Sequence, residues 1–361
     1  MQLTRSRRQT RTVFIGGVGI GGEHPISVQS MTNTDTRDVN ATVAQIKQLE
    51  AAGCEIVRLA VPDETAATAL NQIRQATKIP LVADIHFNYK LALMALESGV
   101  DALRLNPGNI PKPEQVRAVV EAAHQKRVPI RIGVNAGSIN KEILRQFGGP
   151  TPKAMVASAL GHVQILEDLN FEQIIVSLKS SDIAHTLEAN RLFAKERDYP
   201  LHLGITEAGP LVLGTIKSSV GLTLLLGAGL GDTVRVSLTA DPLKEVGTAF
   251  EILRALGLRE YGPQIISCPT CGRTEIDIIS IAEEVEQRIR PIKEPLKIAV
   301  MGCVVNGPGE AAGADFGLAG GKGQGLIFAR GEMVKKVREE QLVEALLDTI
   351  FEHLQKKAPD S

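Results

Sequence analysis

The chain has 361 residues, a formal net charge of −1, and near-average shares of hydrophobic (43%) and charged (22%) residues. The charge balance argues against nucleic-acid proteins that rely on a bulk positive field, and 3% aromatic residues without tryptophan argue against base-stacking surfaces. No run approaches the roughly eighteen apolar residues of a membrane helix, so we expect a soluble α/β protein of the reducing cytoplasm.

A glycine-rich stretch follows the basic N-terminal lead. Residues 13–22 read VFIGGVGIGG, in which Gly17, Gly19 and Gly22 match Gly-x-Gly-x-x-Gly. That fingerprint must open a helix, whereas the following EHPISVQSM has a strand pattern. We therefore interpret the stretch as a glycine-rich β-turn rather than a dinucleotide site.

From Ile26 to Gly257, short aliphatic runs alternate with stretches whose apolar residues recur every three or four positions. Such alternation predicts a parallel sheet covered by helices. Eight units in about 240 residues match a TIM (β/α)8 barrel, and the absence of a working dinucleotide fingerprint disfavours the alternative, a doubly wound open sheet. The predicted strands are 26–31, 56–61, 81–86, 102–107, 130–135, 174–179, 201–207 and 233–238.

Polar residues gather at the predicted carboxyl ends of these strands, where a parallel barrel holds its active site. A charge within a buried apolar strand must point at a partner or a cavity. Four arginines and a lysine directed at one mouth predict a site for a multiply charged anion. Glu207 is the best single candidate for a carboxylate near the chemistry. The residues at these ends are Arg58, Asp84, His86, Arg104, Asn106, Arg131, Asn135, Lys179, Glu207, Arg235 and Ser237.

The periodic pattern ends near Gly257, and a Gly-Pro linker follows. We expect a TIM-barrel substrate-binding domain over residues 1–260 and a small α+β domain over 261–361. In the second domain the sequence predicts a helix over 276–292, a strand over 296–303, a tight turn over 306–310, a hairpin around GGKGQG (320–325) and a C-terminal helix over 339–357. The glycine run lacks the Gly-Lys-Ser/Thr ending of a phosphate-binding loop.

Three of the four cysteines lie in two short segments of this second domain. SCPTCGRTEID carries Cys268 and Cys271 as Cys-x-x-Cys, and MGCVVNGPGEA carries Cys303. A structural zinc site, a thioredoxin-like redox pair and a three-cysteine iron–sulfur cluster all remain open on spacing alone. The fourth thiol, Cys54, lies in an apolar helical run, and we assign it to the barrel core.

These two segments, together with VQSMTNTDTRD, RLNPGN, IRIGVN and SLKSSD in the barrel, closely resemble the 4-hydroxy-3-methylbut-2-enyl diphosphate synthase family. The resemblance runs from about Arg5 to the final helix and matches the two-domain bacterial form. It implies two-electron reductive ring opening of 2-C-methyl-D-erythritol 2,4-cyclodiphosphate, with loss of water, in isoprenoid precursor biosynthesis. It also implies that the second domain is ferredoxin/sulfite-reductase-like.

The resemblance further implies a [4Fe-4S] cluster, with Cys268, Cys271, Cys303 and Glu310 as its ligands. Glu310 is also implied in catalysis at the iron it binds, and Asn306 would lie beside the cluster. In the barrel, Asp84, His86 and Glu207 would face the carbon skeleton of the substrate. The residues implied to clamp the diphosphate are Arg58, Arg104, Arg131, Asn135, Lys179, Arg235 and Ser237.

The implied partners are reduced flavodoxin or ferredoxin as electron donor, and a second copy of the chain. In the homodimer, the cluster domain of one subunit caps the barrel of the other; no nucleic acid or membrane is implied. Two rival interpretations stay open without the resemblance. One is a metal-dependent barrel lyase or aldolase acting on a sugar phosphate, and the other is an iron–sulfur redox sensor.

Overall fold

The structure is a computed structural model that describes residues 6–305 and 307–357. It divides into two compact units, Met1–Arg259 and Glu260–Ser361. Each unit has its own sheet and its own hydrophobic core. No helix within the described ranges is long and apolar enough to cross a membrane.

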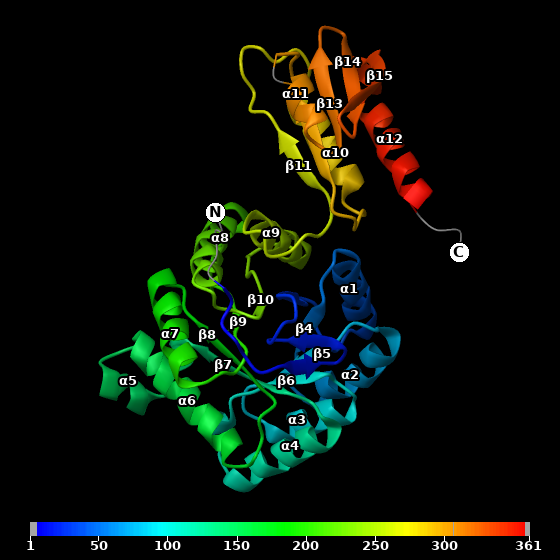
Figure 1. Ribbon diagram of the computed structural model, residues 1–361. Coiled ribbons are helices and arrows are strands. Elements are labelled where there is room, and N and C mark those ends of the chain that lie inside the picture. Colours follow the sequence, from blue (N-terminus) through cyan, green and yellow to red (C-terminus); the bar gives the residue numbers. More distant parts are fainter. Residues whose placement is uncertain (1–5, 306, 358–361) are drawn as a thin grey trace. The chain divides into compact units, whose positions relative to one another are not determined.

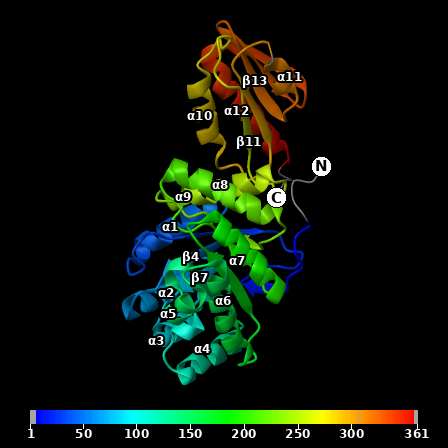
Figure 2. The same cartoon turned by 90° about the vertical axis from the view of Figure 1, so that its left-hand side faces the viewer.

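The first unit is a TIM barrel, as the strand–helix alternation predicts (Figures 1 and 2). Its eight strands pair in parallel in the order β8-β7-β6-β5-β4-β3-β10-β9. A single bridge between Val176 and Leu201 connects β8 to β9 and brings the two ends of the sheet together. The strands are β3 (Ser27–Met31), β4 (Ile56–Ala60), β5 (Leu81–Asp84), β6 (Ala102–Arg104), β7 (Ile130–Asn135), β8 (Ile174–Lys179), β9 (His202–Leu203) and β10 (Thr233–Val234).

A ring of helices covers the outer face of the barrel strands (Figure 1). Several begin at an Asp whose side chain accepts a backbone N–H of the first turn, as at Asp38, Asp63 and Asp182. The helices are α1 (Val39–Ala51), α2 (Glu64–Ala76), α3 (Tyr89–Glu97), α4 (Pro113–Lys126), α6 (Pro152–Glu167), α7 (Ile183–Glu196), α8 (Leu211–Gly227) and α9 (Pro242–Ala255), with a short additional helix α5 (Lys141–Phe147) between β7 and α6.

The last two barrel strands are shorter than the sequence predicts. The predicted runs 201–207 and 233–238 contain only two ladder residues each, in β9 and β10. Beyond Leu203 the chain passes close to its neighbour, since a Cβ on Gly204 would lie 2.4 Å from the carbonyl oxygen of Arg235. Residues 204–207 and 235–238 therefore form loops at the barrel mouth.

The glycine-rich stretch forms a hairpin that closes the amino end of the barrel. Its strands β1 (Val13–Ile15) and β2 (Val18–Ile20) pair antiparallel around Gly16, whose φ of 55° favours glycine. The side chains of Val13, Ile15 and Ile20 pack on the first inward-facing residues of β4, β5, β6 and β8. Only the carboxyl end of the barrel is then left for a site. The four barrel residues of this contact are Ile56, Val82, Ala102 and Ile175.

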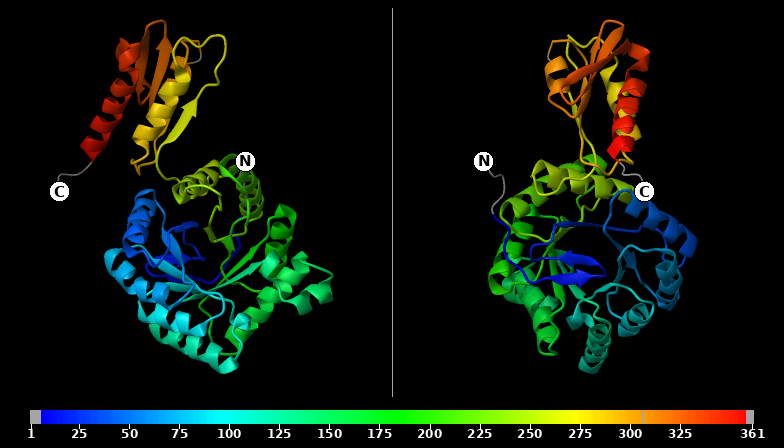
Figure 3. Two further views of the ribbon diagram at one scale, coloured as in Figure 1. Left: turned by 180° about the vertical axis from the view of Figure 1, so that it is seen from behind. Right: turned by 45° about the vertical axis from the view of Figure 1, so that its right-hand side comes forward.

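The second unit is a five-stranded mixed sheet with helices on both faces (Figure 3). β11, β12 and β13 pair in parallel, and β14 and β15 continue the sheet antiparallel. Residues of α10 and α12 share one apolar core with the sheet, and α11 packs in a second core. The elements are β11 (Gln264–Ser267), α10 (Ile278–Ile289), β12 (Lys297–Met301), α11 (Gly307–Ala312), β13 (Phe316–Gly321), β14 (Gln324–Ala329), β15 (Glu332–Arg338) and α12 (Leu342–Lys357).

The sequence predicts most of this unit, with three differences. Strand β11, directly before the Cys-x-x-Cys loop, was not among the predicted elements. The segment expected to be a tight turn before Glu310 instead enters the six-residue helix α11, because Gly307 and Ala311 are buried. Strand β15 was not predicted, because its EMVKKVR sequence exposes both apolar and charged residues at the edge of the sheet. The hairpin around GGKGQG is formed by β13 and β14.

Candidate active site

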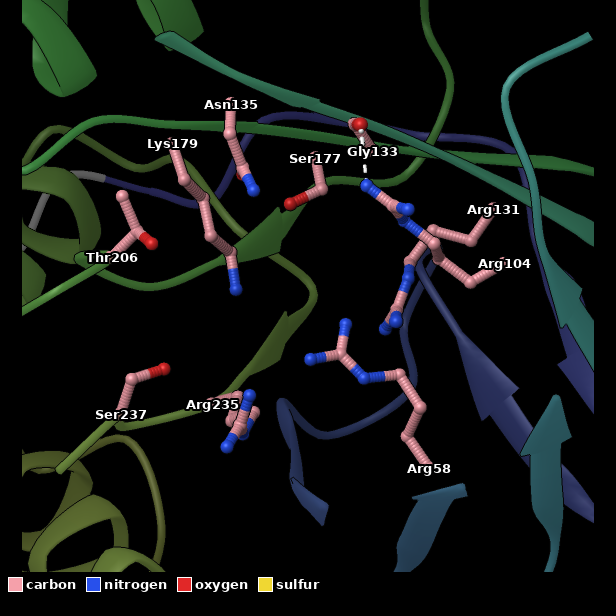
Figure 4. A pocket seen from close by; sticks show the side chains of 10 residues that line it. All are labelled: Arg58, Arg104, Arg131, Gly133, Asn135, Ser177, Lys179, Thr206, Arg235 and Ser237. Atoms are coloured by element: carbon pink, nitrogen blue, oxygen red, sulfur yellow. Dashed lines mark hydrogen bonds between the residues drawn. The ribbon is translucent and has the colours of Figure 1, made fainter. Parts of the chain in front are cut away.

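A pocket opens at the carboxyl end of the barrel and is lined almost entirely by polar groups (Figure 4). Five of its residues are cationic: four lie in the strands β4, β6, β7 and β8, and Arg235 directly follows β10. Arg131 and Lys179 are largely buried, with 3% and 8% of their surface exposed. All seven residues predicted to bind the diphosphate lie in the lining, which comprises Arg58, Arg104, Arg131, Gly133, Asn135, Ser177, Lys179, Thr206, Arg235 and Ser237.

The crowding of these cations is electrostatically unfavourable. Burial, and then repulsion by neighbouring cations, lowers the pKa of Arg131 and of Lys179 well below their usual values. Burial is also the largest cause that lowers the pKa of Arg58 to about 10, and Asp84 only partly opposes it. A bound anion would relieve this repulsion and favour the charged forms of these side chains, so the geometry selects a ligand with several negative charges.

Asp84 is the carboxylate that compensates the arginines on the β4–β6 side of the pocket. Its oxygens lie 3.6 Å from Arg58 Nε, 3.4 Å from Arg104 Nη1 and 3.7 Å from His86 Nε2. Burial acts to raise the pKa of Asp84, but the charges of Arg58 and Arg104 outweigh it and keep that pKa below its usual value. The exposed His86 also contacts Arg104, with 3.2 Å between Nδ1 and Nη1. Asp84 and His86 therefore belong to the rim of the pocket.

Glu207 is exposed on the loop after β9 and is not part of the pocket lining. Its φ of 53° lies in the left-handed region, which residues other than glycine rarely adopt. Asn106 is buried beneath the mouth, where its amide donates to the Gly133 oxygen and accepts from the Gly133 nitrogen, both at 2.9 Å. Asn106 thus fixes the backbone of β7. Asn306 lies outside the described residues.

Sequence reasoning missed Glu245, a buried carboxylate in the first turns of α9. Its oxygens accept hydrogen bonds from Arg235 Nε and Nη2 at 3.3 Å, from Ser30 Oγ at 2.9 Å and from Leu238 N at 3.0 Å. The available signal was a charge within the apolar stripe of the helix, one turn before Ala249. Glu245 holds the guanidinium of Arg235 at the pocket.

Two helix residues that sequence reasoning also missed fix the backbone on either side of Lys179. Asn190 Nδ2 donates to the Leu178 oxygen at 2.9 Å, and the Thr186 hydroxyl accepts from the Ser180 nitrogen at 3.0 Å. Thr186 and Asn190 are fully buried and one turn apart on α7. The strand end that carries Lys179 is therefore rigidly placed.

We expect Glu245→Gln to destabilise the barrel by about 3 kcal/mol, because it leaves Arg235 beside a neutral amide in a buried site. Urea unfolding of the wild type and the variant measures this loss. Glu251→Gln is the matched control, since Glu251 lies on the same helix with 62% of its side chain exposed. Equal unfolding free energies for Glu245→Gln and the control would show that the carboxylate is not needed to hold Arg235.

In the second unit, the cysteine segments follow two neighbouring parallel strands. Ser267 at the end of β11 pairs with Val300 of β12, so Cys268 and Cys303 leave the same end of the sheet. The Gly302 N–H donates to Cys268 Sγ at 3.2 Å, and the Glu275 N–H donates to the Gly302 oxygen at 2.8 Å. These hydrogen bonds join the two cysteine loops.

The Cys-x-x-Cys loop exposes the Cys271 thiol. Hydrogen bonds from Arg273, first from its backbone N–H, lower the pKa of this thiol. Glu310 is exposed in the first turn of α11. Within residues 6–305 and 307–357, no three His, Cys, Asp or Glu side chains lie close enough together to hold a metal ion.

The donor chemistry nevertheless fits an iron–sulfur group. Three thiols leave one end of a sheet, and a backbone N–H already points at one sulfur, as is typical around cluster ligands. Cys54 has a different environment in the barrel: its Sγ lies 3.2 Å from the Ile56 oxygen, and burial raises its pKa to about 12. Such a thiol stays protonated and is not a ligand.

Comparisons with known proteins cover both units. Residues 10–250 match the family model described as the GcpE TIM-barrel domain, and residues 264–352 match the GcpE protein C-terminal domain. The chain is 58% identical to the 4-hydroxy-3-methylbut-2-en-1-yl diphosphate synthase (flavodoxin) of Thermodesulfovibrio yellowstonii, over 95% of this chain and 99% of that protein. It is 59% identical to the protein of the same description from Maridesulfovibrio salexigens, over 98% and 99% of the two chains.

Proposed function

The chain belongs to the GcpE family, the 4-hydroxy-3-methylbut-2-en-1-yl diphosphate synthases, and we propose which of its residues carry the reaction of that family. The enzyme is an iron–sulfur oxidoreductase that opens the ring of 2-C-methyl-D-erythritol 2,4-cyclodiphosphate. Two electrons and a proton convert this substrate to 4-hydroxy-3-methylbut-2-enyl diphosphate and water. The five converging cations of the barrel are the observation that carries the assignment of residues.

The cationic pocket binds the cyclic diphosphate. Arg58, Arg104, Arg131, Lys179 and Arg235 supply donors to its oxygens, and Asn135 and Ser237 supply neutral hydrogen bonds. When the ring opens, the diphosphate gains negative charge at the oxygen that leaves carbon. The same cations stabilise this charge, so their effect is larger on the reacting state than on the bound substrate.

Asp84, His86 and Glu207 face the carbon skeleton. Asp84 and His86 support this role through their contacts with Arg104 at the pocket rim. Glu207 is placed on a mouth loop by a left-handed backbone, and such strained residues cluster at functional sites. We assign to Glu207 the proton that the departing hydroxyl needs to leave as water.

Cys268, Cys271, Cys303 and the carboxylate of Glu310 would hold a [4Fe-4S] cluster. When bound, such a cluster supplies electrons one at a time and offers a Lewis-acidic iron. The fit is supported by the shared sheet end of Cys268 and Cys303 and by the N–H donated to Cys268. Carboxylate is a weaker ligand for iron than thiolate, so Glu310 leaves its iron open to exchange.

The electron donor is reduced flavodoxin or ferredoxin, and the printed names of the relatives support flavodoxin. The exposed Cys271 thiol suits a reducing cytoplasm. The chain works as a homodimer in which the cluster unit of one subunit caps the barrel of the other. Self-association is supported by a row of exposed apolar residues along α8, namely Val212, Ile216, Val220 and Leu224, which are 47–68% exposed.

The reaction is tested by incubating the anaerobic protein with the cyclic diphosphate, dithionite and viologen, and following phosphorus by NMR. The two signals of the cyclic diphosphate should be replaced by those of an open diphosphate monoester. Unchanged cyclic diphosphate, in a sample that contains iron and sulfide, would contradict the assignment. Release of an aldehyde or ketone without consumption of reductant would instead indicate the lyase.

Glu310→Ala should keep most of the iron and sulfide but lose about a hundredfold or more in turnover, because three thiolates still hold the cluster while the reactive iron loses its carboxylate. Metal analysis and the viologen assay measure the two effects separately. Glu284→Ala, at an exposed position of α10, is the control and should change neither. Full turnover by Glu310→Ala would rule out this role for the carboxylate.

A further inference from the structure

His202 is a buried histidine that is neither in the pocket lining nor among the proposed catalytic residues. It lies in β9 with 1% of its surface exposed, and within the described part of the chain neither Nδ1 nor Nε2 has a hydrogen-bond partner. A neutral imidazole offers one donor and one acceptor, and leaving both without partners in a buried site is costly. The side chain therefore requires a partner that its surroundings must supply.

The strand register places His202 in the floor of the cationic pocket. The bridge between Val176 and Leu201 sets Ser177 beside His202, and Thr233 of β10 is its partner on the other side. Residues paired across neighbouring strands point to the same face of the sheet, and Ser177, which lies beside His202, lines the pocket. His202 thus faces the barrel interior beneath the pocket.

Of the two residues beside His202, Thr233 already makes side-chain hydrogen bonds and Ser177 makes none to another described side chain. The Thr233 hydroxyl donates to the Ser27 oxygen at 3.1 Å and accepts from Gln29 Nε2 at 2.8 Å. Gln29 in turn accepts from Arg131 Nη1 at 3.1 Å. The Ser177 hydroxyl, in contrast, has no hydrogen bond to another described side chain. It is free to connect His202 to the pocket.

The ammonium group of Lys179 reaches across to the strand that carries His202. A Cβ on Gly204 would lie 2.8 Å from Lys179 Nζ, so Nζ sits directly against Gly204, two residues beyond His202. No hydrogen bond or ion pair joins Nζ to the described residues. The charged groups that act on it most strongly are Arg131 of β7, Arg58 of β4, Arg235 after β10 and Glu245 of α9; the three arginines repel the ammonium group and Glu245 attracts it.

We propose that His202 is a positioning residue for Lys179: its neutral imidazole accepts a hydrogen bond from one enclosed water that bridges to the ammonium group, and the unbonded Ser177 hydroxyl is a further partner for that water. This contact keeps Lys179 charged and directed at the ligand. Burial, and then the charges of Lys179 and Arg131, hold the pKa of His202 well below its usual value, so the ring is an acceptor at working pH. The proposal rests on the proposed binding of a diphosphate in this pocket.

The test is calorimetric binding of the cyclic diphosphate to the oxidised holoenzyme, without reductant, between pH 6.5 and 9. His202→Phe keeps the size of the ring but removes the acceptor, so the pKa of Lys179 should fall. The charged form is then lost at lower pH, and the alkaline decline in affinity should begin earlier than in the wild type. We expect affinity to fall about tenfold near pH 8.5 and less at pH 6.5.

His202→Asn retains an acceptor and should recover most of the affinity and the wild-type pH dependence. The double variant His202→Phe/Lys179→Met should bind no more weakly than Lys179→Met alone, since the two residues act through one contact. An equal, pH-independent loss for Phe and Asn would overturn the proposal, as would additive losses in the double variant. If His202→Phe does not fold, nitrogen NMR of the wild-type ring decides: a neutral ring down to pH 5.5 supports the proposal, and protonation near pH 6.5 overturns it.

Ligand binding by the wild-type protein separates failure of the His202 proposal from failure of the proposed function. Wild-type protein that binds neither the cyclic diphosphate nor inorganic pyrophosphate would contradict the pocket assignment itself. Wild-type binding that is unaffected by His202→Phe at every pH would contradict only the role of His202.

Discussion

We expect replacement of Cys268 with serine to remove the proposed iron–sulfur cluster and to lower turnover by at least about a thousandfold, because that cluster would supply the electrons for the reaction. Cys268 is the first residue after β11, and its sulfur accepts the Gly302 N–H. Serine at this position offers a harder, less acidic oxygen, which binds iron poorly in such clusters. Iron, acid-labile sulfide and the visible absorption of the anaerobic protein measure the loss.

Cys54→Ala is the matched control for this prediction. Cys54 is buried in the barrel unit, and its thiol is directed at the backbone oxygen of Ile56. Its replacement should leave iron and sulfide unchanged and cost only some barrel stability. Normal cluster content in Cys268→Ser, or loss of the cluster in Cys54→Ala, would contradict the ligand set.

Arg131→Met should lower kcat/KM by about a hundredfold to a thousandfold while leaving the barrel at least as stable as the wild type. The buried guanidinium donates to Gln29 Oε1 at 3.1 Å, and its Nη2 has no partner among the described residues, so its loss removes contacts reserved for the ligand. Methionine also ends the repulsion from the neighbouring arginines and the burial of a charge. Anaerobic kinetics and thermal unfolding measure the two effects.

Arg74→Met gives the opposite pattern and serves as the control. Arg74 of α2 pairs with Asp101 at 2.8 Å and donates to the Ile79 oxygen at 2.9 Å, away from the pocket. Its loss should lower the melting temperature without changing kcat/KM. An Arg131 variant that is destabilised but fully active would show that the arginine serves the fold and not the substrate.

The barrel and its cations were predictable because each signal lies within one strand. Arg58, Arg104 and Arg131 stand inside apolar runs, and strand alternation gives such charges only the barrel interior to face. Glu245 and Asn190 were not predictable in the same way. Their roles depend on which strand end each helix residue reaches, and this is set by packing between elements.

In the second unit, the cysteine loop could be predicted from the sequence, but a helix and the type of metal group could not. The spacing of Cys268 and Cys271 identified a metal-type loop, and the parallel pairing of β11 with β12 brings the Cys303 loop to the same sheet end. The sequence did not reveal α11, because six residues rich in Gly, Pro and Ala give no helical periodicity. Sequence spacing alone also could not separate zinc from an iron–sulfur cluster, since both use thiolates from Cys-x-x-Cys loops.

We propose that this chain combines a diphosphate pocket in the barrel with a cluster held by three cysteines and Glu310. The most direct test of this proposal is a Mössbauer spectrum of the anaerobic protein loaded with iron-57, with iron, sulfide and zinc determined on the same sample. We expect about four irons per chain, no zinc, and one iron distinct from three equivalent ones. In Glu310→Ala, only the distinct iron should change. Four equivalent irons would contradict the role of Glu310, and stoichiometric zinc without iron or turnover would leave a metal-dependent lyase with the same anion pocket.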